Sequence, residues 1–340
     1  MVTIEVLEKE LKAGKLNSLY LLYGEETFLL ETSLKKIKTI FGEKIKGINY
    51  VEIDDTNVNS ILSDIETPAF GYDKKLIIAR KTGLFSKDGK KKTSNLFEIS
   101  TSLSKYIDKN AEILNESIVL VFVEESVEKN DLYKIIEKHG IICNYEKQNP
   151  MQISMRLKAI CNAYKVSIDD STLRYLIDTA GTSMQDLINE IRKLIEYAGE
   201  GGNIKKEDID LLVTKQIESI IFDLTDSLGG KNIKKALDTL NGLLYNKEPI
   251  QKILITLYNH LKKLYLVKLS EKEGRNVSEV LNLKPNQTFL INKYKGQARA
   301  FDESELRNIL EELIELDSNY KIGKIDLNLG LEAILCRYFS

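Results

Sequence analysis

The chain has 340 residues, of which 29% are charged, and a formal net charge of −2. A chain of this length is expected to fold as two or three domains, each with its own core. The balanced charge excludes a protein that binds nucleic acid through an overall basic character, so any contact with DNA must be local. We expect no membrane span and no signal peptide, because the start, Met1 to Leu11, carries acidic residues and lacks a long apolar run.

The cysteines and histidines do not form a metal-binding pattern. Cys143, Cys161 and Cys336 lie far apart in the sequence, and only His139 and His260 accompany them. Zinc sites need closely spaced ligands of these types, so we expect no metal site and no cofactor. Buried, reduced thiols are typical of a cytoplasmic protein, which is the predicted location.

Residues 1–143 alternate between short apolar runs and amphipathic segments, which predicts a mostly parallel sheet covered by helices. The segment Ser86–Thr93 is polar and charged, and we expect it to be a mobile loop. The expected strands are Leu19–Tyr23, Ile48–Ile53, Leu76–Arg80, Ile118–Val123 and Ile141–Cys143.

From Pro150 onward the strand signal disappears and helical spacing replaces it. Apolar residues mark three helices, of which the third begins at Ser183, with Asp186 completing a capping box. This unit ends near the glycine-rich run 199–202, and long helical patterns fill the chain from about residue 214. The sequence therefore predicts an α/β plus all-α fold with three domains, over residues 1–143, 144–213 and 214–340.

The first expected strand leads into Gly24-Glu25-Glu26-Thr27 and then a helix, where a nucleotide-binding α/β domain carries its phosphate loop. Such a loop uses exposed backbone N–H groups, a lysine and a Ser or Thr hydroxyl to bind phosphate and Mg²⁺. This loop has no lysine and two acids, whose charge opposes a phosphate at the helix N-terminus. The sequence indicates the frame of an ATPase without its phosphate-binding chemistry.

Two weaker motifs are interpreted as structural. The segment from Gly83 to Gly89-Lys90 looks like a phosphate loop, but its glycines are six apart rather than five, and Lys91 stands where Ser or Thr is needed. His139 has no nucleophile or second acid placed beside it by a recognisable pattern, so a helix-end histidine is favoured over a general base.

Four segments in order along the chain carry a resemblance to a known family. They are Tyr20–Leu29, Pro68–Gly71 followed by Lys75–Ile78, Asn189–Leu194 and Ile221–Leu228. Together they resemble the delta subunit family of bacterial DNA polymerase III, the clamp-loader subunits that open the sliding clamp, and the resemblance covers essentially the whole chain. It implies an AAA+ architecture with a RecA-like α/β domain, a small helical lid and a C-terminal helical collar, which agrees with the division predicted from periodicity.

The resemblance implies that the ATPase parts are degenerate. A Walker B strand would end in Asp-Glu to hold Mg²⁺, whereas Lys75–Ile78 continues into Ala79-Arg80. The lid helix would carry a sensor arginine where this chain has Met184. Without these groups phosphoryl transfer has no catalytic machinery, so we expect the chain not to be an enzyme. The degenerate nucleotide site comprises Gly24, Glu25, Glu26, Ala79, Arg80 and Met184.

The family's clamp-binding element corresponds to residues 65–72 of this chain. Pro68 is expected to stop a helix and Gly71 to turn the chain, which would hold Phe70 on a projecting tip. An exposed aromatic side chain on a rigid tip is a good anchor for a hydrophobic pocket. Residue type alone favours burial of Phe70 in its own domain, and the family position reverses that preference. The predicted clamp-binding residues are Phe70, Ala69, Pro68, Ile65 and Tyr72, with Ala69 smaller than the aliphatic residue of some relatives.

The resemblance also implies the partners. They are the sliding clamp, or beta subunit, the gamma/tau ATPase subunits and delta-prime, reached through the collar, and primer–template DNA. Asp317, Lys321 and Gly323 match a short family pattern, and the neighbouring Tyr320 could stack on a base. A solvated helix end with a packing tyrosine has at least equal weight. The predicted DNA contacts are Tyr320, Lys321 and Lys324.

Two alternative functions stay open. One is an active AAA+ ATPase subunit or another phosphate-dependent enzyme, which nucleotide binding would reveal. The other is a non-catalytic helical scaffold of another DNA-replication complex, which would lack an exposed apolar tip near Phe70.

Overall fold

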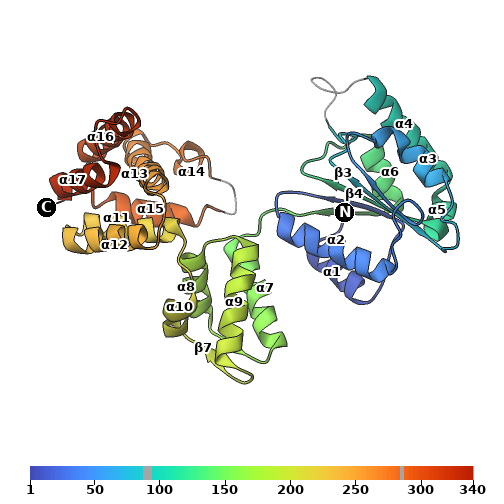
Figure 1. Cartoon of the computed structure of the whole chain (residues 1–340), viewed down its shortest axis with the longest axis horizontal. Coiled ribbons are helices and arrows are strands. Elements are labelled where there is room, and N and C mark those ends of the chain that lie inside the picture. The colour runs from blue at the N-terminus through green and yellow to red at the C-terminus, as the bar shows by residue number, and fades with distance from the viewer. Residues whose placement is uncertain (87–93, 284–286, 340) are drawn as a thin grey trace. The chain divides into compact units, whose positions relative to one another are not determined.

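The computed structural model describes residues 1–86, 94–283 and 287–339. The chain forms two compact units, Met1–Lys147 and Gln148–Ser340 (Figure 1). The first is an α/β unit and the second is mostly helical, which confirms the predicted fold class. The finer division into three domains, with boundaries at residues 143 and 213, stays a prediction.

The first unit contains a parallel five-stranded sheet in the order β2-β3-β4-β1-β5. All five predicted strands are present, and β1 lies between β4 and β5, with Leu19 opposite Leu120 and Tyr20 opposite Ile141. The strands are β1 (Leu19–Tyr23), β2 (Tyr50–Ile53), β3 (Lys75–Arg80), β4 (Ile118–Glu124) and β5 (Ile141–Asn144).

Helices cover both faces of this sheet, with α1 and α2 on one face and α3, α4 and α6 on the other (Figure 1). The strands read as nearly continuous apolar runs because neither face meets water. The helices of this unit are α1 (Ile4–Lys12), α2 (Thr27–Phe41), the 3₁₀ turn η1 (Val58–Ser60), α3 (Ile61–Glu66), α4 (Ser94–Lys109), α5 (Ala111–Ser117) and α6 (Asp131–His139).

The second unit begins with α7 (Pro150–Ala163), α8 (Asp170–Ala180), α9 (Met184–Ala198) and α10 (Lys206–Leu212). It continues as a helical array in which the long α13 packs against α11, α15 and α16 around one apolar core. The members of the array are α11 (Ile217–Gly229), α12 (Ile233–Tyr245), α13 (Ile250–Glu273), α14 (Val277–Val280), α15 (Leu290–Ala298), α16 (Glu303–Lys321) and α17 (Leu327–Phe339).

Three local predictions need correction. The second unit is not free of strands, because β6 (Ser167–Ile168) and β7 (Asn203–Ile204) pair in parallel; two residues are too few to produce an alternating pattern. The second strand begins at Tyr50, since Gly47 adopts φ +82° and the Asn49 side chain accepts from the Ile45 N–H, which holds Ile48 in a turn.

The third correction concerns the start of α9. Ser183 is the N-cap and its hydroxyl accepts from the Asp186 N–H at 3.5 Å, as predicted. The Asp186 carboxylate, however, accepts from Gln216 Nε2 at 3.4 Å, so only the first half of the predicted capping box is present among the described hydrogen bonds. The predicted mobile loop Ser86–Thr93 lies, from residue 87, outside the described residues.

Candidate functional site

The connection from α3 to β3 forms an exposed tip, residues 68–72. Helix α3 ends at Glu66, just before Pro68, which disfavours a helical conformation of the residue before it. The Tyr72 N–H donates to the Ala69 carbonyl at 2.9 Å, and Gly71 adopts φ +80°, so the chain turns at Phe70 and Gly71. The predicted helix stop and turn are therefore both present.

The tip presents one large apolar side chain. Phe70 is 75% exposed, so it does not pack into the core of its own unit. Ala69 and Tyr72 are partly exposed and Pro68 is exposed. Ile65 differs from the prediction: it is 4% exposed and belongs to the core between the sheet and helices α3, α4 and α6, because it lies on the inner side of α3. Ile65 therefore supports the tip from below and offers no surface to a partner.

A buried lysine lies beneath the tip. Lys75, the first residue of β3, is 3% exposed, and its ammonium group donates to the Asp64 carbonyl at 2.9 Å and the Thr67 carbonyl at 2.5 Å. Burial lowers the pKa of Lys75. Sequence reasoning missed this contact; the only available signal was a charged residue at the start of an otherwise apolar strand.

The opposite edge of the sheet, at the carboxyl ends of the strands, contains the predicted degenerate nucleotide site. The Gly24 N–H donates to the Glu124 carbonyl at 3.3 Å, and the Glu26 N–H donates to the Tyr145 carbonyl at 2.8 Å. A Cβ atom on Gly24, whose φ is +132°, would lie 2.4 Å from that same Tyr145 oxygen. Backbone N–H groups of the kind that face phosphate in a phosphate loop are here bonded to the end of β4 and to the segment after β5.

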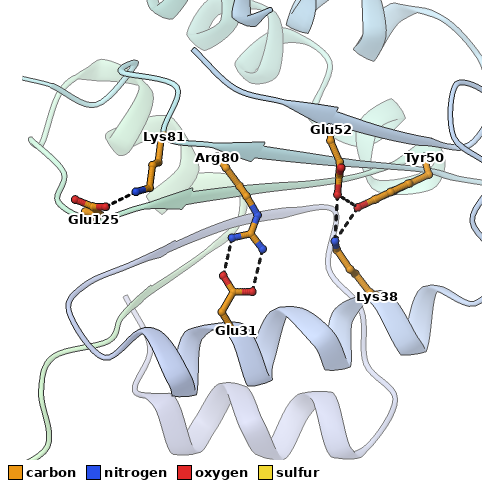
Figure 2. Close-up of polar contacts among 7 residues, drawn as sticks. All are labelled: Glu31, Lys38, Tyr50, Glu52, Arg80, Lys81 and Glu125. Carbon is orange, nitrogen blue, oxygen red and sulfur yellow. Dashed lines mark hydrogen bonds and ion pairs between the residues drawn. The ribbon is translucent and has the colours of Figure 1, made fainter. Parts of the chain in front are cut away.

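The end of β3, where the resemblance predicts that Walker B acids are missing, carries an ion pair. Ala79 is fully buried, and the Arg80 guanidinium donates two hydrogen bonds to the Glu31 carboxylate of α2, at 2.6 and 2.9 Å (Figure 2). These bonds lower the pKa of Glu31. The sequence did not predict this pair, because nothing local connects α2 to the end of β3.

Further polar contacts lie along β2 and just after β3. Lys38 donates to the Tyr50 hydroxyl at 2.7 Å and lies 3.4 Å from the Glu52 carboxylate, and Lys81 pairs with Glu125 (Figure 2). Within the described ranges, no group of three or more His, Cys, Asp or Glu residues is placed to hold a metal ion.

The remaining predicted residues are dispersed. Met184 is 1% exposed at the start of α9, in the second unit. His139 ends α6, as expected of a helix-end histidine, and its Nε2 lies 2.7 Å from Asp108 Oδ1. The second phosphate-loop-like motif, from Gly83 to Lys91, lies mostly outside the described residues.

The predicted DNA contacts lie at the end of α16. Tyr320 is partly buried against the helical core, and its hydroxyl accepts from Gln251 Nε2 at 2.7 Å. Lys321 pairs with Asp317 at 2.5 Å, and Lys324 is exposed. The packed tyrosine matches the structural alternative more closely than a free stacking platform.

A parallel five-stranded α/β unit followed by a mostly helical unit agrees with the predicted AAA+-like fold class. Two family models match it: "DNA polymerase III, delta subunit" over residues 20–146, and "DNA polymerase III delta subunit, C-terminal domain" over residues 218–338. The chain belongs to the delta subunit family of the DNA polymerase III clamp loader, which confirms the resemblance read from the sequence.

Individual relatives agree along nearly the full length. DNA polymerase III subunit delta of Bacillus subtilis is 26% identical over 331 residues, 96% of this chain and 94% of the relative. The probable delta subunit of Aquifex aeolicus is 26% identical over 314 residues, 89% of this chain and 86% of the relative. The solved structure of the Bacillus subtilis DNA clamp loader delta protein superposes with a TM-score of 0.76 at 25% identity, covering 99% of both chains.

Among the described residues, no helix is both long and apolar enough to cross a membrane.

Proposed function

We propose that this chain binds the sliding clamp through the tip, residues 68–72, and favours the open form of the clamp without hydrolysing ATP itself. The observation that carries the proposal is the 75% exposure of Phe70 on a turn bounded by Pro68 and Gly71. A large aromatic ring exposed on an ordered turn is costly to leave in water and gains most when it enters an apolar pocket.

Within the tip, Phe70 would supply most of the binding energy. Ala69 offers little area, Pro68 shapes the turn, and Tyr72 remains partly accessible beside the ring. Anchors of this kind typically contribute about 2 to 4 kcal/mol when a partner buries them. Opening would follow if the tip binds the open form of the clamp more tightly than the closed form, since a ligand shifts an equilibrium only through such a difference.

Three features support the proposed absence of ATP hydrolysis. The loop Gly24–Glu26 carries two acids, and the N–H groups of Gly24 and Glu26 donate to internal carbonyls. Arg80 stands where metal-binding acids would be needed and is paired with Glu31. A buried Met184 takes the place of a sensor arginine. Neighbouring subunits of the clamp loader would then supply the ATP-dependent step, held to this chain through its C-terminal helices.

A local contact with primer–template DNA is a second, separate proposal. Lys324 is exposed after α16, and Lys321 lies beside it in an exposed ion pair that phosphate could replace. Because Tyr320 is packed and hydrogen-bonded, we assign it a supporting role for these lysines. Lys321→Ala with Lys324→Ala should weaken DNA binding by the assembled loader and reduce its salt dependence.

The direct test is the affinity of the full chain for the organism's own sliding clamp, measured by titration calorimetry. Phe70→Ala should weaken binding by roughly thirty- to thousand-fold while leaving thermal unfolding unchanged. Phe97→Ala is the matched control, because Phe97 is also exposed in the same unit, on α4. Unchanged affinity in Phe70→Ala, or equal losses in both variants, would reject the anchor.

The leading alternative, an active ATPase, is tested by equilibrium dialysis with ATP and Mg²⁺. The proposal expects no binding at micromolar nucleotide. Saturable, Mg²⁺-dependent binding would overturn the non-catalytic assignment and leave the clamp contact to be judged by Phe70→Ala alone.

A further inference from the structure

The tip is fastened at the point where it leaves α3. The last carbonyl groups of a helix lack partners within it, and a cation near the helix C-terminus interacts favourably with them. Lys75 fills this role from the next strand: its ammonium group donates to the carbonyls of Asp64, in α3, and of Thr67, the residue before Pro68. The position from which the tip starts is thereby fixed to the start of β3.

The tip is also fastened where it returns to the sheet. Lys74 Nζ donates to the Asn115 carbonyl of α5 at 2.9 Å, and Lys75 stands opposite Ile118 in the β3–β4 ladder. The Thr67 N–H donates to the Ser63 carbonyl at 3.0 Å, which continues the order of α3 to the edge of the tip. Only the short turn through Phe70 lies between these attachments.

Burying an ammonium group costs free energy unless its hydrogen bonds compensate for the lost water. The residues that follow in β3, Leu76 to Ala79, are fully buried and apolar, and of the two charged residues of the strand, Lys75 and Arg80, Lys75 is the buried one. Both acceptors described for its ammonium group belong to the segment that leads into the tip. The bonds therefore hold the segment that carries the exposed Phe70.

We infer that Lys75 is a positioning residue, which holds the tip in its presented conformation in the free subunit and so preorganises Phe70 for its partner. The expected effect on clamp binding rests on the proposed function, whereas the expected effect on the mobility of the tip does not. When only a fraction of molecules has the competent conformation, the apparent affinity falls by that fraction. A residue that keeps the tip ordered removes this loss.

The mobility of the tip can be measured without any partner. The chain contains no tryptophan, so Phe70→Trp introduces a single indole at the tip. In the full chain, time-resolved fluorescence anisotropy should show this indole moving largely with the protein. Adding Lys75→Met, which keeps the side-chain length but removes the donors, should add a pronounced nanosecond component. Lys81→Met, at the other end of β3, is the control and should add none.

The binding arm uses the native Phe70. Lys75→Met should weaken clamp affinity about five- to tenfold, as expected if the tip is ordered in about 10 to 20% of molecules, and Lys75→Arg should recover part of the loss. The inference would be overturned if Lys75→Met left the anisotropy decay unchanged. It would also be overturned if Lys75→Met made the tip mobile without changing clamp affinity, while Phe70→Ala still lost binding. If Phe70→Ala also binds normally, it is the proposed clamp contact that fails.

A measurement on the unaltered chain covers the case in which Lys75→Met does not fold. The Thr67 N–H donates to the Ser63 carbonyl just before the tip, and the Tyr72 N–H donates to the Ala69 carbonyl within it. Both should show protection from hydrogen exchange in the free subunit. Exchange of both at the rates of an unstructured peptide would show that the tip is not held, and would overturn the inference.

Discussion

In the first unit, the two ends of strand β3 lie in contrasting surroundings. At the start of β3 the chain projects, and Phe70 is largely exposed above a buried Lys75. At its end the chain closes, with Arg80 paired to Glu31 and the loop after β1 bonded to Tyr145. The difference teaches that a parallel sheet can satisfy its polar groups within the chain at one edge while it leaves a large apolar side chain exposed at the other.

The largest expected effect is at the closed edge. Gly24→Ala should destabilise the chain by about 3 to 5 kcal/mol, because the new Cβ meets the Tyr145 carbonyl and the backbone is in a region that L residues rarely adopt. Gly42→Ala is the control: Gly42 also has a positive φ, but open space surrounds its Cβ, and about 1 kcal/mol is expected. Urea unfolding of both variants measures the difference. Equal losses would mean that the loop is not closed against Tyr145.

A smaller loss of stability is expected at Ile65, which lies beneath the tip and not on its surface. Ile65→Ala should cost about 2 to 4 kcal/mol of folding free energy, because Ile65 is a core residue. Its clamp affinity, measured well below the melting temperature, should change far less than that of Phe70→Ala. Ile113→Ala, at an exposed isoleucine of α5, should stay within about 0.5 kcal/mol. If the Ile65→Ala protein were stable but no longer bound the clamp, Ile65 would have to be part of the clamp-binding surface.

The Glu31–Arg80 pair should contribute about 1 kcal/mol or less, since both side chains are partly exposed to water. Arg80 lowers the folded-state pKa of Glu31, so the stabilisation is present above the ordinary glutamate pKa and is lost as the pH falls through the lowered value. Glu31→Gln should therefore be less stable than the native chain at pH 7, and the gap should close in acid. A gap that widens in acid would contradict the pairing. Thermal unfolding across this pH range measures it.

No effect on ATP binding is expected from the last change. Restoring a phosphate-loop lysine with Glu25→Gly and Glu26→Lys should still give no ATP binding in equilibrium dialysis, because the N–H groups of residues 24 and 26 already donate to carbonyls of the protein. The variant must first be shown to unfold at a temperature near that of the native chain. If this variant gained Mg²⁺-dependent ATP binding, Glu25 and Glu26 alone would account for the lack of nucleotide binding at this edge.

The features predicted correctly from sequence were those encoded locally. The five strands followed from short apolar runs, and the tip followed from Pro68 and Gly71 around an aromatic residue. The features that were missed depend on partners distant in sequence. Nothing near Arg80 in the sequence indicates its pairing with Glu31, and nothing near Gly24 indicates its close approach to Tyr145. The burial of Ile65 depends on which side of a short helix faces the sheet. Residue type and spacing carry no information about such pairings.

The strand order has a consequence for synthesis of the protein. β1 is the first strand to leave the ribosome, yet its two neighbours in the sheet are β4 and β5, the last strands of the unit. The apolar run Leu19–Tyr23 therefore has no partner in the sheet until the chain has been made as far as β4, and its second edge stays open until Asn144 has been made. Distant pairing of this kind slows folding and leaves an apolar segment exposed to aggregation during synthesis.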